Sequence, residues 1–392
     1  DGNESDKNDL YILKDGKRIN LTAQWDNTVF SYRWSNDGKH IYLIAPTQGT
    51  EQLFVIDVYG KDTTPKQLTK GVYDVGSIVG QSGNLLVIMR NDMNHASEVY
   101  TINLKEKKKG FLSLTQLSHF NDEAYRQIAQ CPIKERIIKT TDGKDMHAWV
   151  IYPPDFDPNK KYPTLLYCEG GPQSALTQFY SFRWNLQLMA SQGYIVIAPN
   201  RRGMPGHGVA WNAEISGDWG GQVMKDYLAA IDDIAKEPYV DTSRLGAVGA
   251  SYGGYSVYYL AGIHNKRFKT FIAHCGVFNT KSMYGTTEEI FFNRHEFGGD
   301  YWDKGNAIAQ KAVTEFNPIE KVEAWDTPIL IIHGGKDYRV PEEQGFQAFT
   351  AAQLRGLKSK LLYFPDENHW VLQPQNGLLW QRTFFKWLKE TL

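Results

Sequence analysis

One serine of this chain stands where a nucleophile would be expected. The sequence around Ser251 reads Gly-Ala-Ser-Tyr-Gly, and it follows the apolar run 245–249. Gly-x-Ser-x-Gly between a strand and a helix is typical of a sharp turn that exposes the serine hydroxyl, because glycine lets the backbone bend that tightly. The apolar residues 255–263 predict a buried helix whose N-terminus faces the serine. The pattern predicts chemistry at carbonyl carbons.

A nucleophilic serine needs a base that takes its proton and an acid that orients the base. In the α/β-hydrolase arrangement these groups follow the serine in the order Asp or Glu and then His, each after a strand. Asp337 follows the apolar run 329–333, and His369 follows the run 360–364. We therefore predict that Ser251, Asp337 and His369 form the catalytic triad.

Other histidines and acids are placed less well for these roles. His333 is the rival base, but it precedes a Gly-Gly turn and the acid itself, so we interpret it as hydrogen-bonded scaffold. Four rival acids either share the loop of the base or follow no central strand; they are Asp366, Glu367, Asp300 and Asp303.

An oxyanion hole should accompany the triad. Its first expected donor is the backbone N–H of Tyr252, directly after the nucleophile. The second should come from the loop that follows the strand 164–168, where the sequence is Glu169-Gly-Gly-Pro. An ordinary strand-ending turn is the alternative interpretation of this loop.

The first third of the chain contains a repeat. Similar apolar quartets begin at Leu10, Leu53 and Val99, about 45 residues apart. Several short strands per unit at this period are typical of β-propeller blades, and about three such units fit before residue 130. Propellers close with roughly four to eight blades. We therefore predict that residues 1–130 are part of a larger propeller in a longer protein, with a small free-standing β-domain as the alternative.

Residues 131–392 show a different pattern, in which strands and helices alternate after a predicted hairpin around residues 142–143. This alternation predicts an α/β-hydrolase domain with a doubly wound, mostly parallel sheet. The expected strands are 136–140, 146–152, 164–168, 194–198, 245–249, 270–275, 329–333 and 360–364. The expected helices lie near 182–191, 223–236, 255–264, 342–355 and 378–392.

Composition disfavours several classes of partner. The 43 basic and 44 acidic residues nearly cancel, which argues against nucleic acid and anionic membranes. No apolar run is long enough for membrane insertion. The cysteines are far apart, so we expect no metal site, disulfide framework or cofactor, and interpret them as small buried hydrophobes; they are Cys131, Cys168 and Cys275.

The chain resembles the prolyl oligopeptidase family of serine peptidases, in which a β-propeller caps an α/β-hydrolase domain. Within the family it is most similar to the branch of bacterial dipeptidyl-peptidase V and the acylaminoacyl-peptidases. The resemblance rests on motifs that begin at Glu169 (EGGPQS), Asn200 (NRRG), Gly217 (GDWG), Gly249 (GASYGGY), Glu296 (EFGGDYW) and Gly335 (GKDYRVP).

The resemblance implies roles for individual residues. It matches Ser251, Asp337 and His369 to the triad, and Tyr252 to the first oxyanion donor. Some members have a tyrosine where this chain has Glu169, whose carboxylate would repel an oxyanion, so the amide of Gly171 is the expected second donor. Arg339 matches a position that holds a substrate carbonyl. The expected S1 pocket is formed by Val277, Phe278 and Tyr284.

These residues suggest a serine peptidase that releases N-terminal dipeptides from oligopeptides through an acyl-enzyme on Ser251. An acylaminoacyl-peptidase or oligopeptidase with the same triad is the main alternative, and a non-catalytic peptide-binding scaffold is a remote one. A carboxylesterase is disfavoured because its cap would usually be helical. Dipeptidyl specificity is implied only by the resemblance, since the acids that bind a free N-terminus in the family lie upstream of this sequence. The resemblance also implies a periplasmic or secreted enzyme and a possible homodimer; no signal segment is present in the sequence.

Overall fold

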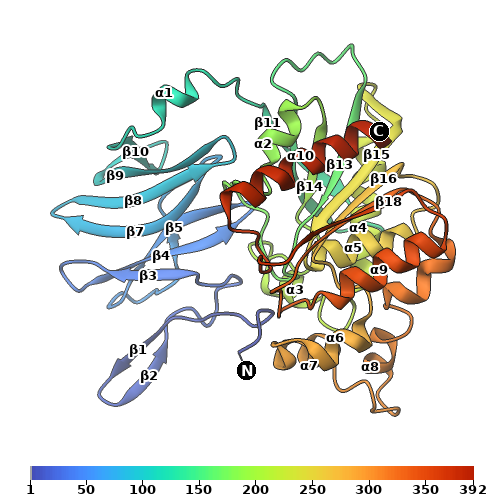
Figure 1. The fold of residues 1–392 in the computed structure, drawn as a ribbon. Coiled ribbons are helices and arrows are strands. Elements are labelled where there is room, and N and C mark those ends of the chain that lie inside the picture. Colours follow the sequence, from blue (N-terminus) through green and yellow to red (C-terminus); the bar gives the residue numbers. More distant parts are fainter. Residues whose placement is uncertain (1) are drawn as a thin grey trace. The chain divides into compact units, whose positions relative to one another are not determined.

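The computed structural model describes residues 2–392, which divide into two compact units (Figure 1). Unit 1 contains the segment that ends at Gln130, together with residues 175–185 and 204–212. Unit 2 contains residues 131–174, 186–203 and 213–392. Two short segments of the second part of the chain therefore fold with the first part.

Unit 1 is built from antiparallel sheets. Its two-stranded sheet consists of β1 (Tyr11–Lys14) and β2 (Lys17–Asn20). One four-stranded sheet contains β3 (Ser31–Trp34), β4 (His40–Thr47), β5 (Thr50–Asp57) and β6 (Lys66–Gln67). The other contains β7 (Asp74–Ser82), β8 (Leu85–Asp92), β9 (His95–Lys108) and β10 (Phe111–Gln116), followed by the short helix α1 (Asp122–Tyr125).

Strand β4 shows how these sheets stack. Ile41 and Leu43 point into a core shared with Leu10 and Leu21, whereas Tyr42 and Ile44 point into a second core. Successive side chains of a strand point to opposite faces, so an apolar strand without alternation must be covered on both faces. The second core also contains side chains of the next sheet: Val75, Leu86, Ile88, Ile102 and Leu112.

In each sheet of unit 1, the repeated apolar quartet falls on the next-to-last strand in chain order. The three apolar quartets fall on β1, β5 and β9, and each of these strands pairs with the strand that follows it. The expected partial propeller is therefore confirmed as a fold, in the form of two four-stranded sheets and one two-stranded sheet.

Unit 1 contains two neighbouring acids, the buried Asp74 and the partly buried Glu51. The Glu51 N–H donates to Asp74 Oδ1 over 2.8 Å. Burial, and secondarily the charge of Asp74, raises the pKa of Glu51 to about 7, and burial raises the pKa of Asp74 to about 6. The folded state therefore holds these protons more tightly than the unfolded chain does.

Linkage gives an expected result for Glu51→Gln. Because the pKa of Glu51 is raised on folding, its protonated form stabilises unit 1 below about pH 4.5, and this stability is lost as the pH rises through about 7. A neutral amide avoids that loss, so the variant should be more stable than the wild type at pH 8, by up to about 3 kcal/mol. Thermal unfolding at pH 5 and pH 8 measures this. The exposed Glu123→Gln is the control, and an unchanged or lower stability of Glu51→Gln at pH 8 would contradict the account.

Unit 2 contains one eight-stranded sheet in the order β11-β12-β14-β13-β15-β16-β17-β18. The first two pairings in this order are antiparallel and the remaining ones are parallel. The strands are β11 (Ile133–Lys139), β12 (Asp145–Ile151), β13 (Tyr162–Cys168), β14 (Ile195–Pro199), β15 (Val240–Ala250), β16 (Thr270–His274), β17 (Ile329–Gly334) and β18 (Ser359–Phe364). The predicted α/β-hydrolase sheet is confirmed.

Helices cover both faces of this sheet (Figure 1). The helix expected over 182–191 forms only from Leu186, and Phe182 is 83% exposed, so the first residues of that prediction were wrong. The helices of unit 2 are α2 (Leu186–Ser191), α4 (Gln222–Ile234), α5 (Tyr252–Ala261), α6 (Thr280–Thr286), α7 (Ile290–Glu296), α8 (Ala307–Ala312), a 3-10 helix (Pro318–Ala324), α9 (Glu343–Leu354) and α10 (Pro374–Thr391). The short helix α3 (Val209–Ala213) lies mostly in the segment 204–212 of unit 1.

The strand order identifies the edge where a ligand should bind. From β13 the chain crosses to β14 on one side and later returns to β15 on the other. The loops that follow such neighbouring strands leave a crevice at their carboxyl ends. The predicted oxyanion loop follows β13 and Ser251 follows β15, so both lie at this switch point.

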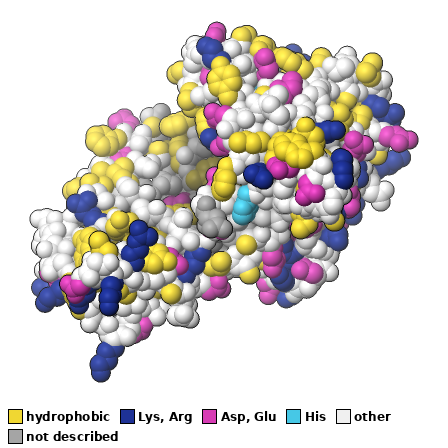
Figure 2. Space-filling model, turned by 90° about the horizontal axis from the view of Figure 1, so that it is seen from below, with side chains coloured by type: hydrophobic (Ala, Val, Ile, Leu, Met, Phe, Trp, Pro, Cys, Tyr) yellow, Lys and Arg dark blue, Asp and Glu magenta, His cyan; other side chains and the backbone are white. Residues whose placement is uncertain are grey.

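The charges on one face of the molecule are mixed in sign. On the face shown in Figure 2, basic and acidic side chains are scattered among one another. Among residues 2–392, no helix combines the length and the apolar character that a membrane crossing requires.

Candidate active site

Ser251 lies on a strained turn between β15 and α5. Its backbone has φ 59° and ψ −121°, a conformation that residues with a side chain rarely adopt. Strain of this kind persists only when the surrounding packing enforces it, and here every residue of α5 is buried. The predicted turn therefore forms, with the serine directly before the first residue of a buried helix.

Gly253 lies directly against the end of β13, where there is no room for a side chain. A Cβ added at Gly253 would lie 2.0 Å from the carbonyl oxygen of Cys168, at the end of β13. Backbone cannot be displaced cheaply, so a side chain at this position would push α5 away from the sheet. The glycine sets the distance between the serine turn and the predicted oxyanion loop.

Gly253→Ala should therefore destabilise the protein by about 1–3 kcal/mol and lower its activity while Ser251 is intact. Gly377→Ala is the matched control, because Gly377 lies in α10 and an added Cβ meets nothing within 4 Å. Chemical denaturation and steady-state kinetics of both variants measure the effect. Equal stability of the two variants would refute the close-packing argument.

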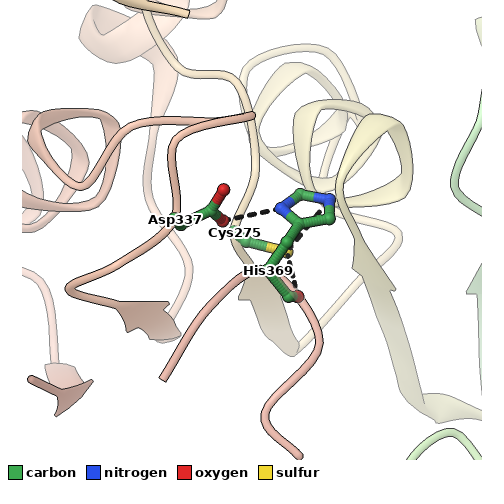
Figure 3. A group of neighbouring side chains, drawn as sticks. All are labelled: Cys275, Asp337 and His369. Atoms are coloured by element: carbon green, nitrogen blue, oxygen red, sulfur yellow. Dashed lines mark hydrogen bonds and ion pairs between the residues drawn. The ribbon is translucent and has the colours of Figure 1, made fainter. Parts of the chain in front are cut away.

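Asp337 and His369 are in direct contact (Figure 3). The Nδ1–H of His369 donates to Oδ2 of Asp337 over 2.6 Å, and both side chains are buried. The other oxygen, Oδ1, accepts from the N–H groups of Arg339 (3.1 Å) and Val340 (2.9 Å). The carboxylate is thereby fixed in orientation, and the imidazole is left with Nε2 as its proton acceptor.

Backbone hydrogen bonds join the two loops that carry this pair. The Gly335 N–H donates to Phe364 O, and the Lys336 N–H donates to Glu367 O, both over 2.8 Å. Glu367 is itself buried, and its carboxylate accepts from the N–H groups of Leu372 and Gln373, directly before α10. Glu367 thus stabilises the histidine loop.

The rivals considered from the sequence have other partners. Nε2 of His333 donates to the carbonyl of Val340 over 2.8 Å, and burial lowers the pKa of His333, so this ring is a neutral scaffold. Asp366 is exposed and pairs with Lys336.

His369 has a neighbour that the sequence did not suggest. Sγ of Cys275 lies 3.9 Å from its Nε2. Burial alone lowers the pKa of His369, but its contacts with Cys275 and Asp337 raise that pKa above its ordinary value. Cys275 follows β16, and the Ser251 N–H donates to the carbonyl of the preceding residue, His274, over 2.9 Å. Ser251 and His369 therefore each lie close to a residue at the carboxyl end of β16.

The predicted oxyanion loop lies against the serine. A Cβ added at Gly170 would be 3.5 Å from Cβ of Ser251, and Gly171 has φ +107°, which favours glycine. Tyr252 is the first residue of α5, so its N–H has no acceptor inside that helix. The Tyr252 hydroxyl donates to Trp219 O and therefore is not directed at a substrate.

Arg201 fixes the loop from behind. Its guanidinium is fully buried and donates to the carbonyl groups of Glu169 (3.2 Å), Gly170 (3.3 Å) and Pro172 (2.6 Å). Carbonyl groups drawn toward one cation leave the N–H groups of the same peptides on the other side. Sequence reasoning missed this role, although Arg201 belongs to the NRRG motif that supported the resemblance.

Arg339 is held at the side of the histidine loop. Its guanidinium lies 5.0 Å from the ring centre of Trp370, and Nη2 lies 2.9 Å from a carboxylate oxygen of Glu289. Trp370 directly follows His369, so this partly exposed cation lies next to the loop of the proposed base.

The three residues expected to form S1 have different surroundings. Val277 is buried, and the Phe278 ring packs between Tyr258 and Trp325, each 5.6 Å away. The Tyr284 hydroxyl donates to Asp300. Tyr284 also lines an open pocket of about 560 Å³ together with Ile290, Phe291, Arg294, Tyr301 and Trp302. Phe278 borders a different open pocket of about 580 Å³, formed with side chains of α9 and the 3-10 helix, so the two rings do not line one common pocket.

The geometry and the sheet order define a class of protein, an α/β-hydrolase preceded by antiparallel sheets. The model of the prolyl oligopeptidase family matches residues 180–392. The chain belongs to the prolyl oligopeptidase family.

Two relatives match most of the chain. It is 48% identical over 394 residues to dipeptidyl-peptidase 5 of Porphyromonas gingivalis. This match covers 100% of this chain and 56% of that protein. It is 48% identical over 352 residues to dipeptidyl-peptidase 5 of Porphyromonas endodontalis. That match covers 90% of this chain and 50% of the relative. The chain thus spans about half the length of these relatives.

Solved structures show the same fold at low identity. Acylaminoacyl peptidase of Pyrococcus horikoshii superposes with a TM-score of 0.86 at 21% identity, over 99% of this chain and 60% of the other. Dipeptidyl peptidase 4 of Porphyromonas gingivalis superposes with a TM-score of 0.78 at 22% identity, over 98% of this chain and 53% of the other. These likenesses concern the fold alone.

Proposed function

We propose that this chain is the catalytic part of a serine peptidase that releases N-terminal dipeptides from oligopeptides. The observation that carries the proposal is the buried contact between Asp337 and His369, next to a strained serine turn. The reaction is supported by these residues. The dipeptidyl specificity is supported by the 48% identity to two dipeptidyl-peptidases 5.

The reaction proceeds in two halves. His369 Nε2 takes the proton of the Ser251 hydroxyl while the serine oxygen attacks the carbonyl carbon of the scissile peptide bond. The same imidazolium, held by Asp337, then gives its proton to the leaving amine. An acyl-enzyme remains, and water attacks it by the same route to release the dipeptide and restore the hydroxyl.

The oxyanion formed in each half is stabilised by fixed backbone N–H groups of Tyr252 and Gly171. Such donors are effective because they need no reorganisation when the charge develops. In this proposal Arg201 is a positioning residue, since it holds the carbonyl groups of the loop around Gly171.

The S1 assignment is also part of the proposal. We assign Val277 and Tyr284 to its walls and give Phe278 a supporting position behind them, because its ring is already packed between Tyr258 and Trp325.

A matched substrate panel tests the specificity. The full-length protein is assayed with dipeptidyl reporter substrates that have a free or an acylated N-terminus and are otherwise identical. A dipeptidyl-peptidase should cleave the free form and reject the blocked form. Preference for the blocked form would favour an acylaminoacyl-peptidase, and cleavage inside longer peptides would favour an oligopeptidase. No cleavage of any member would favour the binding scaffold.

Arg339→Gln tests the substrate-binding role proposed for this arginine. A charge-assisted hydrogen bond to a substrate carbonyl contributes about 1.5–3 kcal/mol, so kcat/KM should fall about tenfold or more, mainly through a higher KM. Arg355→Gln, at an exposed position after α9, is the control. Unchanged KM and kcat in the Arg339 variant would show that the cation only pairs with Glu289.

A further inference from the structure

Glu296 is a buried acid that the reaction does not use directly. It is the last residue of α7 and is 1% exposed. Its Oε1 accepts from Nε2–H of Gln173 over 2.9 Å and from the hydroxyl of Ser216 over 2.8 Å. Its Oε2 accepts from Nε1–H of Trp219 over 2.8 Å. Gln173 lies in the motif EGGPQS, Trp219 lies in GDWG and Glu296 begins EFGGDYW, so this carboxylate joins three motifs that are far apart in the sequence.

The bond to Gln173 holds the loop of Gly171, the proposed second oxyanion donor. A Cβ added at Gly171 would lie 2.6 Å from the backbone nitrogen of Gln173, two residues further along the chain. The ring of Pro172 restricts the φ angle between them, so little freedom separates the two residues. Arg201 binds the carbonyl of Pro172 over 2.6 Å, and Glu296 binds the Gln173 side chain. The orientation of the Gly171 amide therefore depends on both contacts.

The bond to Trp219 leads to Tyr252, the proposed first donor. The two rings meet edge to face, with 5.0 Å between their centres. The carbonyl of Trp219 accepts a hydrogen bond from the Tyr252 hydroxyl over 2.7 Å. Trp219 also packs against Phe297, which directly follows Glu296, with 5.1 Å between the ring centres. A displacement of Trp219 would therefore disturb the start of α5, which carries the Tyr252 N–H.

We propose that Glu296 is a positioning residue for both sides of the oxyanion hole. It holds the Gly171 amide through Gln173 and the Tyr252 amide through Trp219. Fixed N–H groups stabilise a developing oxyanion because they need no reorganisation, and this advantage is lost when the groups that carry them can move. The inference rests on the proposed serine peptidase function, but it does not depend on which end of the peptide is recognised.

Glu296→Leu removes all three acceptor contacts and keeps a side chain of similar size. We expect kcat of the full-length protein to fall about ten- to hundredfold, at most as much as the loss of a whole oxyanion donor causes. KM should stay near the wild-type value, because the lost interaction acts in the transition state. Steady-state kinetics with a reporter substrate that the wild-type protein cleaves measure both constants, and circular dichroism shows whether the variant is folded.

Inhibitor binding separates positioning from a general disturbance of the site. The serine hydroxyl adds to the carbonyl carbon of a peptidyl trifluoromethyl ketone, its proton passes to the imidazole, and the oxygen of the adduct occupies the oxyanion hole. An analogue in which CH₂ replaces this carbonyl forms no adduct. Glu296→Leu should bind the ketone about ten- to hundredfold more weakly than the wild type does, and should bind the analogue equally well.

Trp387→Phe is the matched control for the loss of a buried hydrogen bond. Trp387 lies in α10, is 1% exposed, and donates from Nε1–H to Thr270 Oγ1 over 2.9 Å. This variant should lose thermal stability but keep its kcat, whereas Trp219→Phe, which removes the corresponding donor to Glu296, should lower kcat. If Glu296→Leu does not fold, Trp219→Phe and Gln173→Met provide the same test, because each breaks one of the two links.

Two outcomes would overturn the proposal. One is a folded Glu296→Leu protein with the kcat of the wild type. The other is an equal loss of affinity for the ketone and for its analogue without the carbonyl. Absence of hydrolysis by the wild-type protein would instead refute the proposed peptidase function itself, and the positioning role with it.

Discussion

Ser251→Ala is expected to lower kcat by a factor on the order of 10⁶, because alanine offers no oxygen that can form the acyl-enzyme. The fold should be preserved, since a methyl group fits wherever the serine Cβ fits and does not change the glycines that permit the turn. Steady-state kinetics with a dipeptidyl reporter substrate measures the loss.

Ser243→Ala is the matched control, at an exposed position earlier on the same strand, β15. It should retain normal turnover. If the Ser251 variant retained more than about one thousandth of the wild-type rate with a native circular dichroism spectrum, another residue would be the nucleophile.

Asp337→Asn is expected to lower kcat by about 10⁴. The amide nearly matches the carboxylate in shape, but its NH₂ group can donate to Nδ1 of His369. The imidazole proton then moves to Nε2, the nitrogen that must accept the serine proton. The contact of 2.6 Å between Oδ2 and Nδ1 makes this tautomer effect direct.

Asp366→Asn separates this effect from a general loss of negative charge near the site. Asp366 lies on the loop of His369, but it is exposed and pairs with Lys336. Its variant should have turnover close to the wild type. Equal losses in the two variants would remove Asp337 from its proposed role.

The local parts of this site could be predicted from the sequence. Gly-x-Ser-x-Gly after an apolar run constrains the backbone directly, and the turn at Ser251 forms as expected. The order serine, acid, histidine along the chain places Asp337 and His369 after neighbouring parallel strands, which explains why their contact could be expected although 32 positions separate them.

Packing contacts between distant segments could not be predicted in this way. Cys275 and His369 are 94 positions apart, and no sequence pattern links the two. Their contact arises because β16 and β18 flank β17 in the sheet. Cys275 was interpreted as a small buried hydrophobe, which describes its burial but not its partner.

Arg201 shows the same limit for a charged residue. Arginine is rarely fully buried, and nothing in the sequence pattern indicated that its guanidinium would bind three backbone carbonyls of the loop after β13. The repeat in unit 1 could be predicted because it depends only on strands that follow each other along the chain.

The central claim is that His369, oriented by Asp337, activates Ser251 as the nucleophile. Labelling with an organophosphonate probe, followed by mass spectrometry of the modified peptide, tests it most directly. The folded full-length protein should be labelled at Ser251, and His369→Ala should greatly slow that labelling. Failure to label Ser251, or equal labelling rates in the two proteins, would contradict the account.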